Sequence, residues 1–124
     1  MIRIVTESMS DFTQEEAKAA DLIVMPLPIR FGMEEYWDDG VSLTQDDFYA
    51  RLRVAKALPK TSQVPVEHYR KCFNRLLENP EDEVLVITGS SKLSGCYQSA
   101  CIAREACHDP ARVTVLDSLN ATCA

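Results

Sequence analysis

The fold is decided by the stretch VLVITGSSKLSG at Val84–Gly95. Its first four residues form a continuous apolar run, which is typical of a central strand buried on both faces of a parallel sheet. The segment that follows is rich in hydroxyl groups and ends where a helix is predicted, at residues 95–107. A strand, a polar loop and a helix in this order predict an α/β unit.

The rest of the chain repeats this alternation of strands and helices. Further strands are predicted at residues 2–6, 22–25 and 113–116, and further helices at residues 13–20, 42–56 and 65–77. Pro26 and Pro28 restrict residues 29–31 to an edge or irregular strand, with residues 34–37 as its hairpin partner. We therefore predict one α/β domain over residues 1–124, with a mainly parallel sheet flanked by helices.

The composition of the chain argues against nucleic-acid binding and against a membrane span. The chain has 124 residues, of which 46% are hydrophobic and 26% charged, and its formal net charge is -6. An acidic chain repels the phosphate backbone of nucleic acids, so nucleic-acid binding is not expected. No run reaches the roughly 18–20 apolar residues of a membrane span. The first residues predict a strand and not a signal peptide, which predicts a cytoplasmic location.

The residues that would bind a metal or a nucleotide lack the required spacing. None of the five cysteines forms a C-x-x-C pair, and His68 and His108 are not at metal-ligand spacing. Gly89 and Gly95 do not fit the glycine patterns of dinucleotide or P-loop sites. We therefore predict no metal site and no cofactor, and reduced thiols.

Two loops rich in hydroxyl groups are the candidate functional segments. The first hydroxyl loop is Thr61-Ser62-Gln63, and the second hydroxyl loop covers residues 90–95. Each precedes a predicted helix, where free backbone N–H groups, hydroxyls and the positive end of the helix dipole favour a small anion such as a carboxylate or phosphate. Ser and Thr before helices are also ordinary N-caps. Ligands of open α/β sheets lie beyond the carboxyl ends of the strands. Both loops can reach that edge, so capping and ligand binding both remain open.

Several distinctive motifs follow one another along the chain: IRIVTES at residues 2–8, LPKTSQ at 58–63, SSKLSG at 90–95, YQSA at 97–100 and VLDS at 115–118. In this order they resemble the N-terminal domain of the DegV family of bacterial fatty-acid-binding proteins. The resemblance covers essentially the whole chain. It implies a DegV-type domain that is the first, lipid-binding half of a normally two-domain protein.

The resemblance also implies a function without catalysis. A long-chain fatty acid would be held with its carboxylate on the hydroxyls of Thr61 or Ser62 and of Ser94, assisted by the backbone N–H of Gly95. Some family members present the acid to a separate fatty acid kinase for phospholipid synthesis. The alternative is an enzyme domain that binds phosphate or another small anion, because the family's fold is related to a dihydroxyacetone-kinase domain.

The chain departs from the family pattern at positions close to these loops. Glu7 stands where Asp is usual, which can reshape the first loop after the N-terminal strand. Cys96 stands where Thr is usual, which removes one candidate hydroxyl. Val64 follows Gln63 where the family often has Pro.

Overall fold

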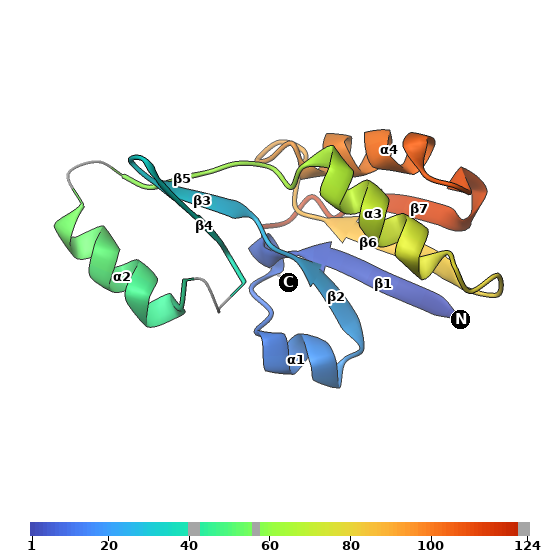
Figure 1. Cartoon of the computed structure of the whole chain (residues 1–124), viewed down its shortest axis with the longest axis horizontal. Coiled ribbons are helices and arrows are strands. Elements are labelled where there is room, and N and C mark those ends of the chain that lie inside the picture. The colour runs from blue at the N-terminus through green and yellow to red at the C-terminus, as the bar shows by residue number, and fades with distance from the viewer. Residues whose placement is uncertain (40–42, 56–57, 122–124) are drawn as a thin grey trace.

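A four-stranded parallel sheet forms the centre of the computed structural model, which describes residues 1–39, 43–55 and 58–121. Its strands are β1 (Ile2–Glu7), β2 (Leu22–Met25), β6 (Glu83–Thr88) and β7 (Val113–Asp117). They lie in the order β2-β1-β6-β7, and every neighbouring pair is parallel (Figure 1). The helices packed on this sheet are α1 (Gln14–Ala19), α3 (Val66–Leu76) and α4 (Cys96–Ala106). The predicted α/β class with a mainly parallel sheet is confirmed.

A second, antiparallel sheet was only partly predicted. It contains β3 (Pro28–Phe31), β4 (Glu34–Trp37) and β5 (Lys60–Thr61), with β3 in the centre. The expectation that residues 29–31 form an edge or irregular strand is wrong. Pro28 is the first residue of β3, so its missing N–H interrupts no hydrogen bond inside the strand.

Helix α2 (Gln45–Val54) packs beside this second sheet. The ring centroids of Phe48 and Phe31 lie 5.8 Å apart, which joins α2 to β3. The ends predicted for this helix, at residues 42 and 56, lie outside the described residues. Short 3-10 helices occur at Ser8–Ser10 and Pro110–Arg112.

The hydrophobic core lies between the parallel sheet and helices α3 and α4. Val5, Val84 and Val86 point from the sheet into this layer and are at most 2% exposed. Tyr69 and Phe73 of α3 meet them and are fully buried. Aromatic side chains supply much of the area that such a core removes from water.

The opposite face of the parallel sheet is less covered. Side chains alternate between the two faces of a strand, so Leu85 and Ile87 lie opposite the buried Val84 and Val86, and both are half-buried. Leu116, paired with Ile87, is 51% exposed. The prediction that this run is buried on both faces therefore holds fully for only one face.

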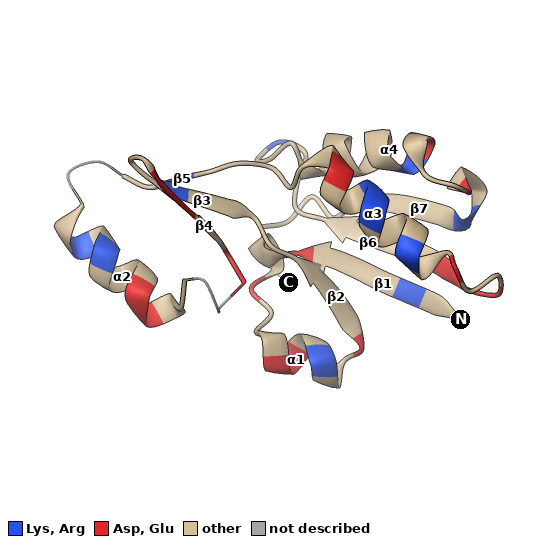
Figure 2. Cartoon of the chain, viewed as in Figure 1, with Lys and Arg blue, Asp and Glu red and all other residues tan. Residues whose placement is uncertain are grey.

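Local polar signals explain where two helices begin. The Thr13 hydroxyl accepts a hydrogen bond from the N–H of Glu16, whose carboxylate accepts one from the N–H of Thr13. Thr44 caps α2 through the N–H of Asp47. Acidic residues occupy the first turns and basic residues the last turns of α1, α2 and α3 (Figure 2), an order that the helix dipole favours.

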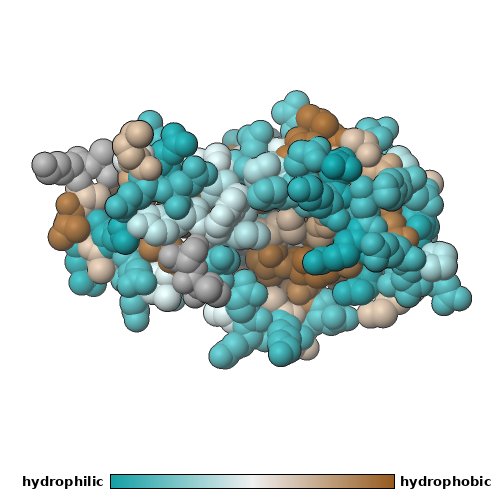
Figure 3. Space-filling view, in the orientation of Figure 1, coloured by the Kyte–Doolittle hydropathy of each residue, from teal (hydrophilic) through white to brown (hydrophobic). Residues whose placement is uncertain are grey.

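The surface carries both polar and apolar regions. In the view of Figure 3, polar side chains surround an apolar region that lies over β2. Among the described residues, no helix is long and apolar enough to cross a bilayer.

Candidate functional site

The first hydroxyl loop leaves the antiparallel sheet and runs towards the start of α4. Thr61 pairs with Ile29 as the last residue of β5, although the sequence predicted a loop there. The N–H of Ser62 donates to the carbonyl oxygen of Pro28 at 3.3 Å. The side chains of Thr61 and Ser62 are exposed. The backbone of this loop is therefore anchored while its two hydroxyls face solvent.

The second hydroxyl loop follows β6 and is ordered by its own serines. Ser90 is 4% exposed, and its hydroxyl accepts a hydrogen bond from the N–H of Lys92 at 3.2 Å. Its carbonyl oxygen accepts from the N–H of Ser94 at 3.1 Å. The N–H of Ser91 donates to the carboxylate of Asp117 at 3.2 Å, which ties the loop to the end of β7. Ser90 and Asp117 thus shape the loop that carries Ser94.

Ser94 is half-buried directly before α4, and it already has a structural role. Its hydroxyl oxygen accepts a hydrogen bond from the N–H of Cys96, the first residue of the helix, at 3.2 Å. A hydroxyl has one donor and two acceptor positions, so this bond leaves Ser94 capacity for a further partner. The Ser94 hydroxyl therefore supports the start of α4, although Gly95 is the N-cap residue and no side chain caps this helix. This contact does not exclude ligand binding.

The two loops contact each other through residues next to the predicted site residues. The side chain of Gln63 lies over Gly95, where an added Cβ would be 2.8 Å from Gln63 Cδ. The N–H of Val64 donates to the sulfur of Cys96 at 3.4 Å. A side chain at position 95 would meet Gln63, so this packing of the two loops depends on glycine there.

The structure therefore brings the predicted residues into one region without joining them directly. Ser62 precedes Gln63, and Ser94 precedes Gly95, so each hydroxyl is adjacent to a residue of the contact. Among the described residues, no hydrogen bond links the side chains of Thr61, Ser62 and Ser94. A shared carboxylate position for these groups stays a prediction.

An open hollow of about 670 Å³ lies beside the second loop and the first turns of α4. It contains both Ser94 and Gly95. The exposed Lys92, which the sequence analysis did not select, also lines it. An amino group near a helix N-terminus favours an anion. The signal was present in the SSKLSG motif, but a single lysine in a loop is not diagnostic.

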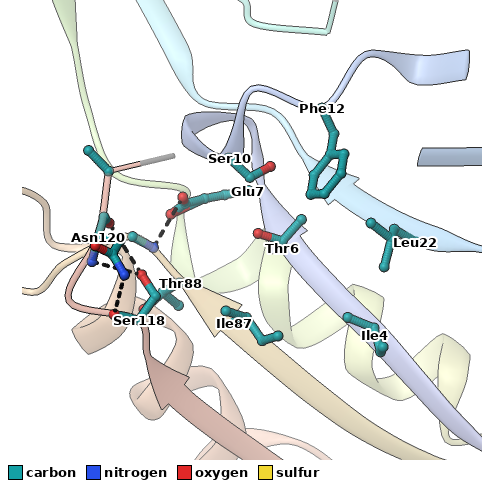
Figure 4. Close-up of a pocket in the computed structure, with 12 residues that line it drawn as sticks. Ile4, Thr6, Glu7, Ser10, Phe12, Leu22, Ile87, Thr88, Ser118 and Asn120 are labelled. Atoms are coloured by element: carbon teal, nitrogen blue, oxygen red, sulfur yellow. Dashed lines mark hydrogen bonds between the residues drawn. The ribbon is translucent and has the colours of Figure 1, made fainter. Parts of the chain in front are cut away.

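A second pocket, of about 260 Å³, lies against the less covered face of the sheet. Figure 4 shows Phe12, Leu22, Ile4 and Ile87 forming its apolar side. Its other side is polar and includes the Glu7 side chain. The pocket therefore joins an apolar sheet surface to the carboxyl end of β1.

Glu7 is unexpectedly buried for a residue with an ionisable side chain, with only 1% of its surface exposed. One carboxyl oxygen accepts a hydrogen bond from the N–H of Gly89 at 3.2 Å, drawn in Figure 4. The other has no hydrogen-bond partner among the described residues. Burial raises the pKa of Glu7, although the Cys96 thiol and the Gly89 N–H act in the opposite direction. The residue type does not predict this burial, because Glu is mostly an exposed residue.

The described residues do not form a metal-binding cluster. They contain no group of three or more His, Cys, Asp or Glu side chains that could hold a metal ion. His68 instead lies against Trp37, with ring centroids 5.1 Å apart. Beside the two loops, hydroxyls, backbone N–H groups and the Lys92 amino group can donate to a ligand.

Comparisons with known proteins agree on one family. Residues 1–124 match the family model described as "Uncharacterised protein, DegV family". A DegV domain-containing protein of Caldanaerobacter subterraneus is 39% identical over 121 residues, covering 98% of this chain and 42% of the relative. A "Fatty acid-binding protein" of Thermotoga maritima is 35% identical over 128 residues, with the same two coverages. The chain thus spans less than half the length of these relatives.

A solved structure shows the same arrangement. The stearic acid-binding protein of Eubacterium ventriosum superposes with a TM-score of 0.88 at 32% identity, covering 98% of this chain and 43% of that one. This similarity extends over both the parallel sheet and the loops described above.

Proposed function

The chain belongs to the DegV family, and on this premise we propose that it supplies the carboxylate-binding part of a fatty-acid carrier. The ligand is a long-chain fatty acid. Its carboxylate accepts hydrogen bonds from the hydroxyls of Thr61 or Ser62 and of Ser94, and from the N–H of Gly95. Charge-assisted bonds of this kind are stronger than those between neutral groups.

One observation carries this proposal: the first hydroxyl loop is packed onto the N-terminus of α4. The Gln63 side chain covers Gly95, and the N–H of Val64 bonds to Cys96. The exposed residues 61–62 directly precede this packed segment, and the helix start it covers has first N–H groups without an intrahelical partner. Both features support a shared anion position. A loop that served only as a cap would not need hydroxyls from a second loop beside it.

The names of similar proteins support a fatty acid over other anions. The Thermotoga maritima relative is named a fatty acid-binding protein, and the Eubacterium ventriosum structure is described as binding stearic acid. The same donors also suit phosphate, but no observation on this chain favours the phosphate-binding enzyme domain considered from the sequence.

The wider role rests on the same family membership. We propose a carrier without catalysis of its own, which works in the bacterial cytoplasm and presents the bound acid to a fatty acid kinase for phospholipid metabolism. Residues 1–124 form the N-terminal domain of this carrier, and a second domain closes over the lipid. No nucleic acid and no stable membrane insertion are part of this function.

Lipid extraction of the full-length natural protein, purified from bacteria, tests the proposal directly. Mass spectrometry should detect a long-chain fatty acid in stoichiometric amount. A variant with Thr61→Val, Ser62→Ala and Ser94→Ala should lose it, while the matched control Thr114→Val, an exposed hydroxyl on β7, should keep it. A wild-type protein that carries no fatty acid and binds none on titration would refute the function.

A further inference from the structure

Cys96 contacts both hydroxyl loops although it is completely buried. Its sulfur accepts the hydrogen bond from the N–H of Val64 in the first loop at 3.4 Å. Its own N–H donates to the hydroxyl oxygen of Ser94 in the second loop at 3.2 Å. Because Cys96 is the first residue of α4, it also fixes both loops to the start of that helix.

The Cys96 thiol also has a neighbour on the side that faces the parallel sheet. Glu7, at the end of β1, interacts with the Cys96 side chain and contributes to raising its pKa, although burial contributes most. Glu7 is itself bonded to the N–H of Gly89 at the end of β6. The sulfur thus lies between the parallel sheet below and the two loops.

The bond to Val64 matters because its N–H has no access to water. Val64 is fully buried, and a buried donor without an acceptor costs more than a hydrogen bond contributes. A sulfur atom is a weak acceptor, but here it takes the bond that fixes the backbone two residues after Ser62. Loss of this acceptor favours movement of the first loop away from α4.

We propose that Cys96 is a positioning residue of the carboxylate site, which holds the Thr61-Ser62 loop and Ser94 at a fixed separation. The proposal deepens the function given above and rests on it. Cys96 does not touch the ligand, because its side chain faces the interior. Its sulfur acts on the first loop through the N–H of Val64 and on the second through its side-chain interaction with the Ser94 hydroxyl.

A matched pair of variants separates this role from simple packing. Cys96→Ser and Cys96→Ala leave voids of similar size, but only serine keeps an acceptor for the N–H of Val64. An N–H···O bond is shorter than one to sulfur, so the loop must move slightly inward to form it. Stearic acid is the probe, titrated into the full-length natural protein after delipidation.

The expected result is unequal loss of binding. Cys96→Ala should weaken stearate binding about three- to tenfold, the range of one hydrogen bond, and Cys96→Ser should recover most of it. In a Ser94→Ala background the effect of Cys96→Ala should shrink, since part of it acts through Ser94. Equal affinities of the Ser and Ala variants would overturn the proposal.

Hydrogen exchange of the Val64 amide provides a readout that needs no ligand. Exchange should be faster in Cys96→Ala than in Cys96→Ser, and equal exchange would also overturn the positioning role. If the wild-type protein binds no stearate, the proposed function fails, and the amide measurement alone then decides whether Cys96 holds the loops together.

Discussion

Replacement of Gly95 by alanine tests the contact on which the site depends. The backbone at Gly95 has φ -85° and ψ 5°, which alanine can adopt, so the substitution introduces no left-handed strain. The new Cβ would lie 2.8 Å from Gln63 Cδ, whereas ordinary contacts begin at 3.4 Å. Gln63 Oε1 would be closer still to the new Cβ, so the Gln63 side chain must rotate away.

We expect Gly95→Ala to weaken ligand binding more than it lowers the free energy of unfolding. Gln63 is exposed, so its side chain can move at a cost below about 1 kcal/mol in the free energy of unfolding. Its displacement separates the first loop from the start of α4, where we place the carboxylate. We expect Gly95→Ala to weaken stearate binding in the full-length natural protein by about 1 kcal/mol, or roughly fivefold.

A double-mutant cycle with Gln63→Ala checks the cause. If the new methyl group acts by displacing Gln63, Gly95→Ala should have little effect on the dissociation constant once Gln63 is alanine. Titration calorimetry of the wild type, both single variants and the double variant gives the coupling. Additive effects of the two substitutions would refute the reasoning, because the methyl group would then act without Gln63.

Further predictions concern Ser94, Thr13 and Glu7. Ser94→Ala should weaken stearate binding by about 1.5–3 kcal/mol, the range for hydrogen bonds to charged groups. It should also lower the free energy of unfolding by about 1 kcal/mol, because the bond from the N–H of Cys96 is lost. Unchanged affinity would leave Ser94 with only a structural role at the start of α4. Thr13→Ala, which breaks a cap far from the site, should cost a similar stability of about 1 kcal/mol but leave the titration unchanged. The free energy of unfolding of the Glu7→Gln variant should increase relative to that of the wild type as pH rises above 4.5, the ordinary pKa of the carboxyl. Urea unfolding at several pH values measures this difference. A difference that stays constant with pH would contradict a raised pKa.

The parallel sheet was predictable because its signals are local. The apolar run at Val84–Ile87, the hydroxyl loop after it and the helix stripe on α3 each follow from a few neighbouring residues. The capping box at Thr13 and Glu16 similarly marks the start of α1 within four positions. Such patterns determine element type before any tertiary contact forms.

The second sheet was not predictable in the same way. Strand β5 has two residues, Lys60 and Thr61, and it exists because they pair with β3 about thirty positions earlier. No periodicity can appear in two residues. The prediction of Thr61 in a loop therefore failed for a non-local reason, although its exposure and its place before α3 were compatible with the predicted binding role.

The candidate site also combines residues that were predictable from the sequence with contacts that were not. The hydroxyls of Thr61, Ser62 and Ser94 were visible in the sequence because hydroxyl residues cluster before helices. The contacts that bring the loops together were not visible, because Val64 and Cys96 are 32 positions apart. A buried valine and a buried cysteine look like ordinary core residues until the structure shows the bond between them.

The protonation of Glu7 links folding to the electrostatics of the site. Its pKa is raised above 4.5 in the folded protein, so the folded state binds more protons than the unfolded state at pH values between the two pKa values, and stability falls as pH rises through that window. Below 4.5 both states are protonated and the effect vanishes. Within that window a protonated Glu7 places no negative charge beside Cys96. An ionised Glu7 would repel the carboxylate that those loops are proposed to hold, so the burial that raises its pKa reduces this repulsion within the same pH window.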